Sequence, residues 1–195
     1  GGDSMESGHR LRTLMLCLAA ATVTACTTPD PAPPPNSTTP STPIPAPSLD
    51  VARYLTEPCS GVPTELTTRL GLPKRDNAHD TVLVGAGEQA ECRLSSGPPL
   101  SAAAEVRFYP RVRPLALVTG PGSQVKPTTT AGYPAGEWVL STGTDGSFTS
   151  CQIIVDIAET QGLATLYNGP SGEPVETSCD HAGQLADGVI TAILR

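Results

Sequence analysis

The sequence predicts an α+β domain over residues 49–195, built on an antiparallel sheet of about five strands with a short N-terminal helix, a C-terminal amphipathic helix and two disulfides. Three observations lead to this fold class. Several short segments alternate apolar and polar residues or are rich in β-branched residues, which is typical of strands. The C-terminal segment repeats apolar residues at helical spacing. Four cysteines lie in this region, an even number that is typical of disulfide pairing.

A short helix is expected at residues 63–70, before the first strand. Proline is favoured at the start of a helix, where its missing N–H leaves no bond unmade, and Pro63 stands there. Leu66 and Leu70 are four residues apart and would lie on one face. Gly71 follows, which favours the end of the helix at this point.

Five segments are expected to form the strands: 90–94, 102–109, 137–141, 149–157 and 163–167. The second segment shows the pattern most clearly, because its alanine, valine and phenylalanine residues alternate with glutamate and arginine. Residues 143–146, with the sequence Gly-Thr-Asp-Gly, predict a hairpin turn between the third and fourth strands. Antiparallel pairing is therefore expected.

The C-terminal helix is expected at residues 179–194. Its apolar residues fall three or four positions apart and would form one stripe that packs on the sheet: Ala182, Leu185, Ala186, Val189, Ile190 and Ile193. Thr177 or Ser178 could cap its N-terminus. Packing accounts for the whole stripe, so the sequence gives no reason to assign the stripe to a partner.

The cysteines of the domain are expected to form two disulfides, for which three connectivities exist: Cys59, Cys92, Cys151 and Cys179. We favour pairing the first with the second and the third with the fourth. Each bridge would then join a helix-adjacent segment to a strand and close a loop of about 30 residues, worth roughly 3 to 4 kcal/mol in the chain-entropy model.

No metal, cofactor or catalytic residue is expected. The cysteines include no C-x-x-C pair, and His79 and His181 lie at no ligand spacing to them. Each histidine has an adjacent aspartate, but no serine stands in a G-x-S-x-G motif that would supply the nucleophile of a hydrolase. Residues 85–87, Gly-Ala-Gly, lack the remainder of a phosphate-binding fingerprint, so a turn is the favoured interpretation.

Composition argues against nucleic acid as a partner. The chain carries 12 Lys and Arg against 19 Asp and Glu, a formal net charge of −7, without a block of like charge. Four arginines could gather into a site for an anionic headgroup or wall polymer, although separate solvated charges are the favoured interpretation: Arg93, Arg107, Arg111 and Arg113.

Residues 1–25 are interpreted as a signal peptide, in which residues 1–4 precede the start at Met5. A basic stretch leads into an apolar run that ends at Val23. This run is too short to cross, as a helix, a hydrocarbon layer of about 30 Å. It is therefore typical of a signal peptide rather than of a membrane anchor.

Residues 23–26, with the sequence Val-Thr-Ala-Cys, resemble the bacterial lipobox, so Cys26 is the predicted lipid-attachment residue. The alternative is a cleaved secretory signal, with Cys26 as a chance residue or a disulfide partner. The position of Cys26, directly after the apolar run and before a proline-rich segment, favours lipidation. The expected location is the outer face of the cytoplasmic membrane or the cell envelope, with the membrane as partner through a multi-chain lipid anchor.

Residues 26–48 are interpreted as the lipidated cysteine followed by a disordered tether. From Thr27 to Ser48, nine of 22 residues are proline and eight are serine or threonine. Such a segment has no apolar periodicity and favours polyproline II. Its reach is on the order of 70 Å, enough to hold a domain clear of the lipid headgroups.

Several short motifs together resemble the actinobacterial lipoproteins classed as domain-of-unknown-function family 3558. They are residues 57–59 (Glu-Pro-Cys), a short helix ending in Leu-Gly at 70–71, Cys-Arg at 92–93, and Cys179 opening a C-terminal helix that contains Leu-Ala at 185–186. Such proteins often have tryptophan where this chain has Leu94. The resemblance implies an envelope protein of mycobacteria and their relatives, and it brings no established activity or catalytic residue.

These observations favour a cell-envelope lipoprotein that serves as a non-catalytic binding or accessory module for a protein, glycan or lipid partner. The alternative is an envelope enzyme, such as a hydrolase, or an accessory that senses a small ligand. The segment 110–134, rich in proline, glycine and threonine, is the expected recognition loop.

Overall fold

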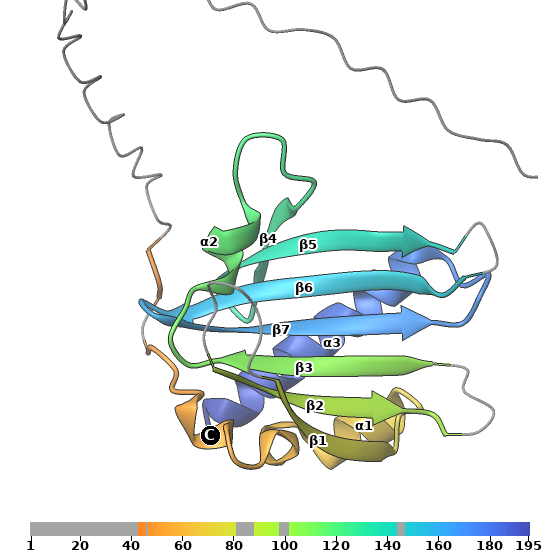
Figure 1. Ribbon diagram of the computed structural model, residues 1–195, viewed down its shortest axis with the longest axis horizontal. Coiled ribbons are helices and arrows are strands. Elements are labelled where there is room, and N and C mark those ends of the chain that lie inside the picture. Colours follow the sequence, from red (N-terminus) through yellow and green to blue (C-terminus); the bar gives the residue numbers. More distant parts are fainter. Residues whose placement is uncertain (1–42, 46, 81–87, 98–101, 144–146) are drawn as a thin grey trace, which may run out of the picture. The chain divides into compact units, whose positions relative to one another are not determined.

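The computed structural model describes residues 43–45, 47–80, 88–97, 102–143 and 147–195, and these form an α+β domain (Figure 1). The predicted signal peptide, Cys26 and the tether up to residue 42 lie outside the described residues, as do the Gly-Ala-Gly motif at 85–87 and most of the expected turn at 143–146. The elements are the 3-10 helices η1 (Ala52–Tyr54) and η2 (Pro58–Gly61), α1 (Thr64–Arg69), β1 (Lys74–Asp80), β2 (Gln89–Ser95), β3 (Ala103–Tyr109), α2 (Pro114–Val118), β4 (Lys126–Thr130), β5 (Tyr133–Thr142), β6 (Thr149–Ala158), β7 (Gln161–Gly169) and α3 (Val175–Ile193).

The seven strands form one antiparallel sheet in the order β1-β2-β3-β7-β6-β5-β4. Strands that follow one another in sequence pair with one another, except that β3 pairs with β7, which returns to the middle of the sheet. In this central pair Val106 lies opposite Thr165. The fold class expected from the sequence is therefore confirmed, with two strands more than the five expected.

The two additional strands, β1 and β4, are the edges of the sheet. Their sequences are KRDNAHD and KPTTT, which carry no alternating apolar residues. An edge strand pairs on one side and faces water on the other, so charged residues and proline are tolerated there. The strand pattern therefore could not reveal these two elements.

Helix α3 covers one face of the sheet, crossing behind the strands in Figure 1. The predicted stripe is confirmed, because its first five residues are completely buried and Ile193 is 8% exposed. The helix begins at Val175, four residues earlier than expected. The predicted cap is wrong: the residue before the helix is Pro174, and Ser178 lies inside the helix, where its hydroxyl donates to Glu173 at 2.6 Å.

Two disulfides link helical segments to strands of the sheet. Cys59 of η2 is bonded to Cys92 of β2, and Cys151 of β6 is bonded to Cys179 of α3. The bridges span 33 and 28 residues of sequence. Disulfides of this kind persist in oxidising compartments, so they indicate an extracytoplasmic location.

Helix α1 packs close to α3, as expected for a short helix with a buried leucine. Leu66 is 4% exposed, and a Cβ added at Gly188 of α3 would lie 2.4 Å from its Cδ2 atom. Gly71, after α1, has a positive φ of 70°, which only glycine adopts readily. The predicted end of this helix is therefore confirmed.

The apolar clusters of the domain are all formed by residues between Ile44 and Ile193. A chain that begins at Thr27 therefore keeps the whole of this core. No helix within the described ranges has both the length and the apolar character needed to cross a bilayer.

Candidate functional site

The face of the sheet opposite α3, here called the open face, carries the candidate site. Residues on this face alternate with the core residues of each strand, so Ile154 and Asp156 point away from α3 while Ile153 and Val155 point toward it. The short helix α2 packs over β6 and β7 on this side (Figure 1). Because α2 is only five residues long, it covers a small part of the face.

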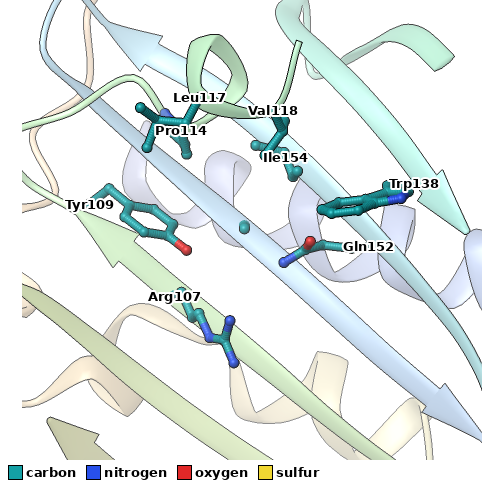
Figure 2. Close-up of a pocket in the computed structure, with 9 residues that line it drawn as sticks. Arg107, Tyr109, Pro114, Leu117, Val118, Trp138, Gln152 and Ile154 are labelled. Atoms are coloured by element: carbon teal, nitrogen blue, oxygen red, sulfur yellow. The ribbon is translucent and has the colours of Figure 1, made fainter. Parts of the chain in front are cut away.

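A pocket of about 220 Å³ lies beside α2 on the open face. Figure 2 shows the rings of Trp138 and Tyr109 on opposite sides of it, with the Gln152 amide directed toward the space between them. The pocket is bounded by residues of α2, β3, β5, β6 and β7: Arg107, Tyr109, Pro114, Leu117, Val118, Trp138, Gln152, Ile154 and Ala164. Most of these side chains are apolar or aromatic, which is typical of small-molecule sites.

Two glycines allow α2 to approach the sheet closely. A Cβ at Gly162 of β7 would lie 2.1 Å from the Cδ atom of Pro114, at the start of α2. A Cβ at Gly136 of β5 would lie 2.7 Å from a Leu115 methyl group. Both distances are far shorter than van der Waals contact. The pocket wall formed by α2 therefore depends on two glycines in the strands beneath it.

Asp156 holds the first turn of α2 in place. Its carboxylate is 1% exposed and accepts hydrogen bonds from Arg113 Nε at 2.8 Å and from the Leu115 backbone N–H at 3.1 Å. Burial raises the pKa of Asp156, and the two hydrogen bonds with Arg113 and Leu115 oppose this rise. The helix is thus held by a buried charge as well as by apolar packing.

A charged cluster borders the pocket on β2 and β3. The Glu91 side chain is 2% exposed and accepts from Arg93 Nε at 2.5 Å and from Arg107 Nε at 2.8 Å. Arg107 also pairs with Glu105. Two carboxylates therefore balance two guanidinium groups, and the cluster carries no net charge.

Tyr109 connects the charged cluster to the pocket. Burial raises the pKa of its phenol, while the charge of Arg107 and a hydrogen bond with it act in the opposite direction. Tyr109 is 4% exposed, and its ring forms one side of the pocket. The polar end of this ring therefore lies beside Arg107 of the charged cluster.

Gln152 supplies the one amide side chain among the residues that line the described pocket. The residue is 9% exposed, and its amide takes part in none of the hydrogen bonds found among the described residues. A primary amide offers two donors and one acceptor, and leaving such groups unpaired in an apolar setting is unfavourable. A bound molecule could satisfy this amide.

The structure brings together only some of the arginines considered from the sequence. Arg93 and Arg107 meet at Glu91, and Arg113 pairs with Asp156 at a separate place. The favoured interpretation of the sequence is that each arginine is a separate solvated charge. This interpretation is wrong for Arg107 and Arg113, which are ion-paired and whose side chains are only 27% and 12% exposed. It holds for Arg111, which is exposed.

The two histidines lie on different elements. His79 is in β1, and His181 is in α3, where its ring makes an edge contact with Tyr167 at 4.6 Å between centroids. Within the ranges that the structure describes, no group of three His, Cys, Asp or Glu side chains is arranged to hold a metal ion.

The segment 110–134 was expected to be an irregular recognition loop, but it contains regular secondary structure. It contains α2 and β4. Its contribution to the site is helix α2, which supplies Pro114, Leu117 and Val118 to the pocket. The periodicity of α2 was too short to be recognised, because five residues make little more than one turn.

Of the pocket residues on the strands, the sequence had pointed only to Arg107, as part of a possible anion site, and the others were not predicted. The apolar run at 153–155 was a usable signal, since consecutive apolar residues indicate a strand that is buried on both faces. Such a strand requires a cover on the second face as well as α3 on the first. No pattern in the sequence indicated that α2 would be the cover.

Comparison with known proteins identified one family. The family model described as "Protein of unknown function (DUF3558)" matches residues 21–192. No curated protein and no solved structure matches the chain. The match spans most of the chain, including nearly all of the described domain and the residues of the predicted lipobox.

Proposed function

The chain belongs to the DUF3558 family, a family of unknown function, and we propose that it is a lipid-anchored envelope protein that binds a small ligand in the pocket beside α2. The observation that carries this proposal is the pocket itself, an apolar cavity of about 220 Å³ with a polar amide inside it. In this view the protein is a binding or accessory module, and the anchor keeps it at the membrane.

The anchoring half of the proposal rests on the lipobox-like residues 23–26 and on the two disulfides. Lipidation would place the domain outside the cytoplasmic membrane, where the disulfides can form and persist. The proline-rich residues that follow Cys26 would separate the domain from the lipid surface. Several acyl chains make such an attachment stable, because each buried CH₂ contributes about 0.8 kcal/mol.

The binding half rests on the shape and chemistry of the open face. Apolar residues line most of the pocket, and a few polar groups converge on it, which is the usual composition of ligand sites. The sequence led us to expect a protein, glycan or lipid partner, whereas this arrangement supports the alternative of a small ligand. The charged cluster and Asp156 hold the walls in position.

Detergent partitioning tests the anchor. In a host that processes lipoproteins, Cys26→Ala should move the chain from the detergent phase to the aqueous phase. Cys17→Ala is the matched control, because Cys17 lies in the predicted signal peptide and its loss should change nothing. Retention of the Cys26→Ala chain in the detergent phase would overturn the lipid anchor.

Native mass spectrometry of protein purified from its own cells tests the pocket. We expect a bound small molecule that is lost in Ala164→Leu, because Ala164 is 2% exposed and lines the cavity. Ala116→Leu is the control, an exposed alanine of α2. Equal retention of the molecule in both variants, or no bound molecule in either variant or the unchanged chain, would contradict the proposal.

A further inference from the structure

We propose that the pocket takes an uncharged ligand group that carries one apolar ring and one amide or hydroxyl group. This inference rests on the proposed function and adds the chemical class of the ligand. Four properties of the site lead to it: the volume of the cavity, the two aromatic rings beside it, the balance of charge around it and the Gln152 amide.

The volume sets the size of the group. A dry apolar cavity of about 150 Å³ is large enough to bind benzene, whereas pockets for whole drug-sized molecules are about 300–1,000 Å³. The cavity here, about 220 Å³, holds one ring and a few further atoms. Any larger remainder of the ligand lies outside the pocket.

The rings of Trp138 and Tyr109 favour a ring over a flexible chain. They stand on opposite sides of the cavity (Figure 2). Aromatic side chains attract a third ring in offset or edge-to-face geometry, by about 0.5–1.5 kcal/mol beyond the burial of apolar surface. Ile154 and Leu117 supply the apolar contacts on the remaining sides.

The balance of charge excludes a charged group. Arg107 is the one ionisable cation that lines the described pocket, and it is already paired with both Glu91 and Glu105. A ligand carboxylate would meet a guanidinium whose charge is already balanced by these two carboxylates, and a ligand cation would face Arg107 itself. Either charge would lose its hydration without gaining a free partner.

The Gln152 amide supplies the polar contact. It is nine-tenths buried and makes no hydrogen bond to any described residue, yet it is directed into the cavity. An amide or hydroxyl group can both donate to it and accept from it without adding charge. The ligand can therefore form a hydrogen bond with an amide for which no described residue is a partner.

Fluorescence of the single tryptophan of the chain reads the site directly, because Trp138 lines the pocket. The chain from Thr27 to Arg195 is titrated with benzamide, toluene, benzoate and benzamidinium. Benzamide should give a saturable change and bind about tenfold or more tightly than either charged probe, since an unpaired charge would be desolvated. Toluene should bind about three- to tenfold more weakly than benzamide, because it leaves the Gln152 amide unpaired.

Two variants test whether the Gln152 amide forms the hydrogen bond with the ligand. Gln152→Leu should reduce benzamide to the affinity of toluene and leave toluene binding as tight or tighter. Gln184→Leu, at an exposed position of α3, is the matched control and should change neither affinity. Unchanged preference for benzamide in Gln152→Leu would overturn the role of this amide.

The outcomes separate this inference from the proposed function. Tighter binding of benzoate or benzamidinium than of benzamide would overturn the uncharged class while the pocket remained a binding site. Failure of all four probes to bind would also overturn the inference. The proposed function would then be decided by whether protein from its own cells still carries a molecule that Ala164→Leu loses.

Discussion

The two faces of the sheet are built on different principles. The α3 face is closed by a long helix whose apolar stripe is fully buried, and a disulfide links the helix to β6. The open face buries charges, Glu91 and Asp156, and leaves a cavity beside a five-residue helix. Apolar packing stabilises a fold without a large desolvation cost, whereas buried charges need partners to offset their desolvation.

This difference suggests a division of roles within one small domain. The α3 face supplies stability, and the open face carries groups whose placement stability alone does not require. Buried polar groups and unfilled space are features that functional sites often retain. Changes on the α3 face should therefore alter the free energy of unfolding, and changes of exposed side chains that line the pocket should mainly alter binding.

The largest expected effect compares two leucines on opposite faces. Leu185→Ala removes a completely buried side chain of α3 and should lower the free energy of unfolding by about 2–5 kcal/mol. Leu117→Ala, at a position 54% exposed on α2, should lower it by less than about 0.5 kcal/mol. Urea denaturation followed by circular dichroism measures both. Similar decreases in the free energy of unfolding of the two variants would contradict the proposed difference between the two faces.

The next largest effect concerns the close contact between α2 and strand β7. Gly162→Ala would place a methyl group 2.1 Å from Pro114 and should force α2 outward, at a cost of about 1–3 kcal/mol. The emission of Trp138 should change in the folded state, because the pocket opens.

Gly183→Ala is the control for this substitution. A Cβ at Gly183 of α3 meets no atom within 4 Å, so alanine should raise the free energy of unfolding by about 0.5–1 kcal/mol. A Gly162→Ala protein as stable as the unchanged chain, with the same emission, would show that α2 does not need this close approach.

The smallest effect is the pH dependence from Asp156. Its folded-state pKa is raised above the ordinary value of 3.8, so the folded state binds more protons than the unfolded state over this interval. Its contribution to stability is therefore full below pH 3.8 and is lost as pH rises through the raised pKa. Relative to Asp156→Asn, the unchanged chain should lose stability over that rise.

Chemical denaturation at a series of pH values measures this difference. Asp187→Asn, at an exposed position of α3, controls for the loss of one negative charge. If the unchanged chain instead gained stability over Asp156→Asn with rising pH, the hydrogen bonds to Arg113 and Leu115 would outweigh the burial of the carboxylate.

The α3 face could be predicted from the sequence, because its signals are local. The helical stripe from Ala182 to Ile193 and the alternation at 102–109 each report burial on one side of an element. The edge strands β1 and β4 could not be predicted, since residues such as those of Lys126–Thr130 face water on most sides.

The pocket could not be predicted, because it depends on contacts between distant segments. Pro114 meets Gly162, and Trp138 of β5 comes to lie across from Tyr109 of β3 only after β6 and β7 have been placed between them. Each of these residues has an ordinary structural interpretation when taken alone. The pocket therefore exists only because the strands lie in this order in the sheet, and the sequence pattern does not predict the strand order.

The central claim, that the open face is the binding face, is tested most directly by amide and side-chain NMR shifts of the chain from Thr27 during a benzamide titration. We predict that the indole N–H of Trp138, the side-chain amide of Gln152 and the backbone of α2 shift together with one dissociation constant. Shifts confined to α3, or no saturable shift at these three places, would contradict the account.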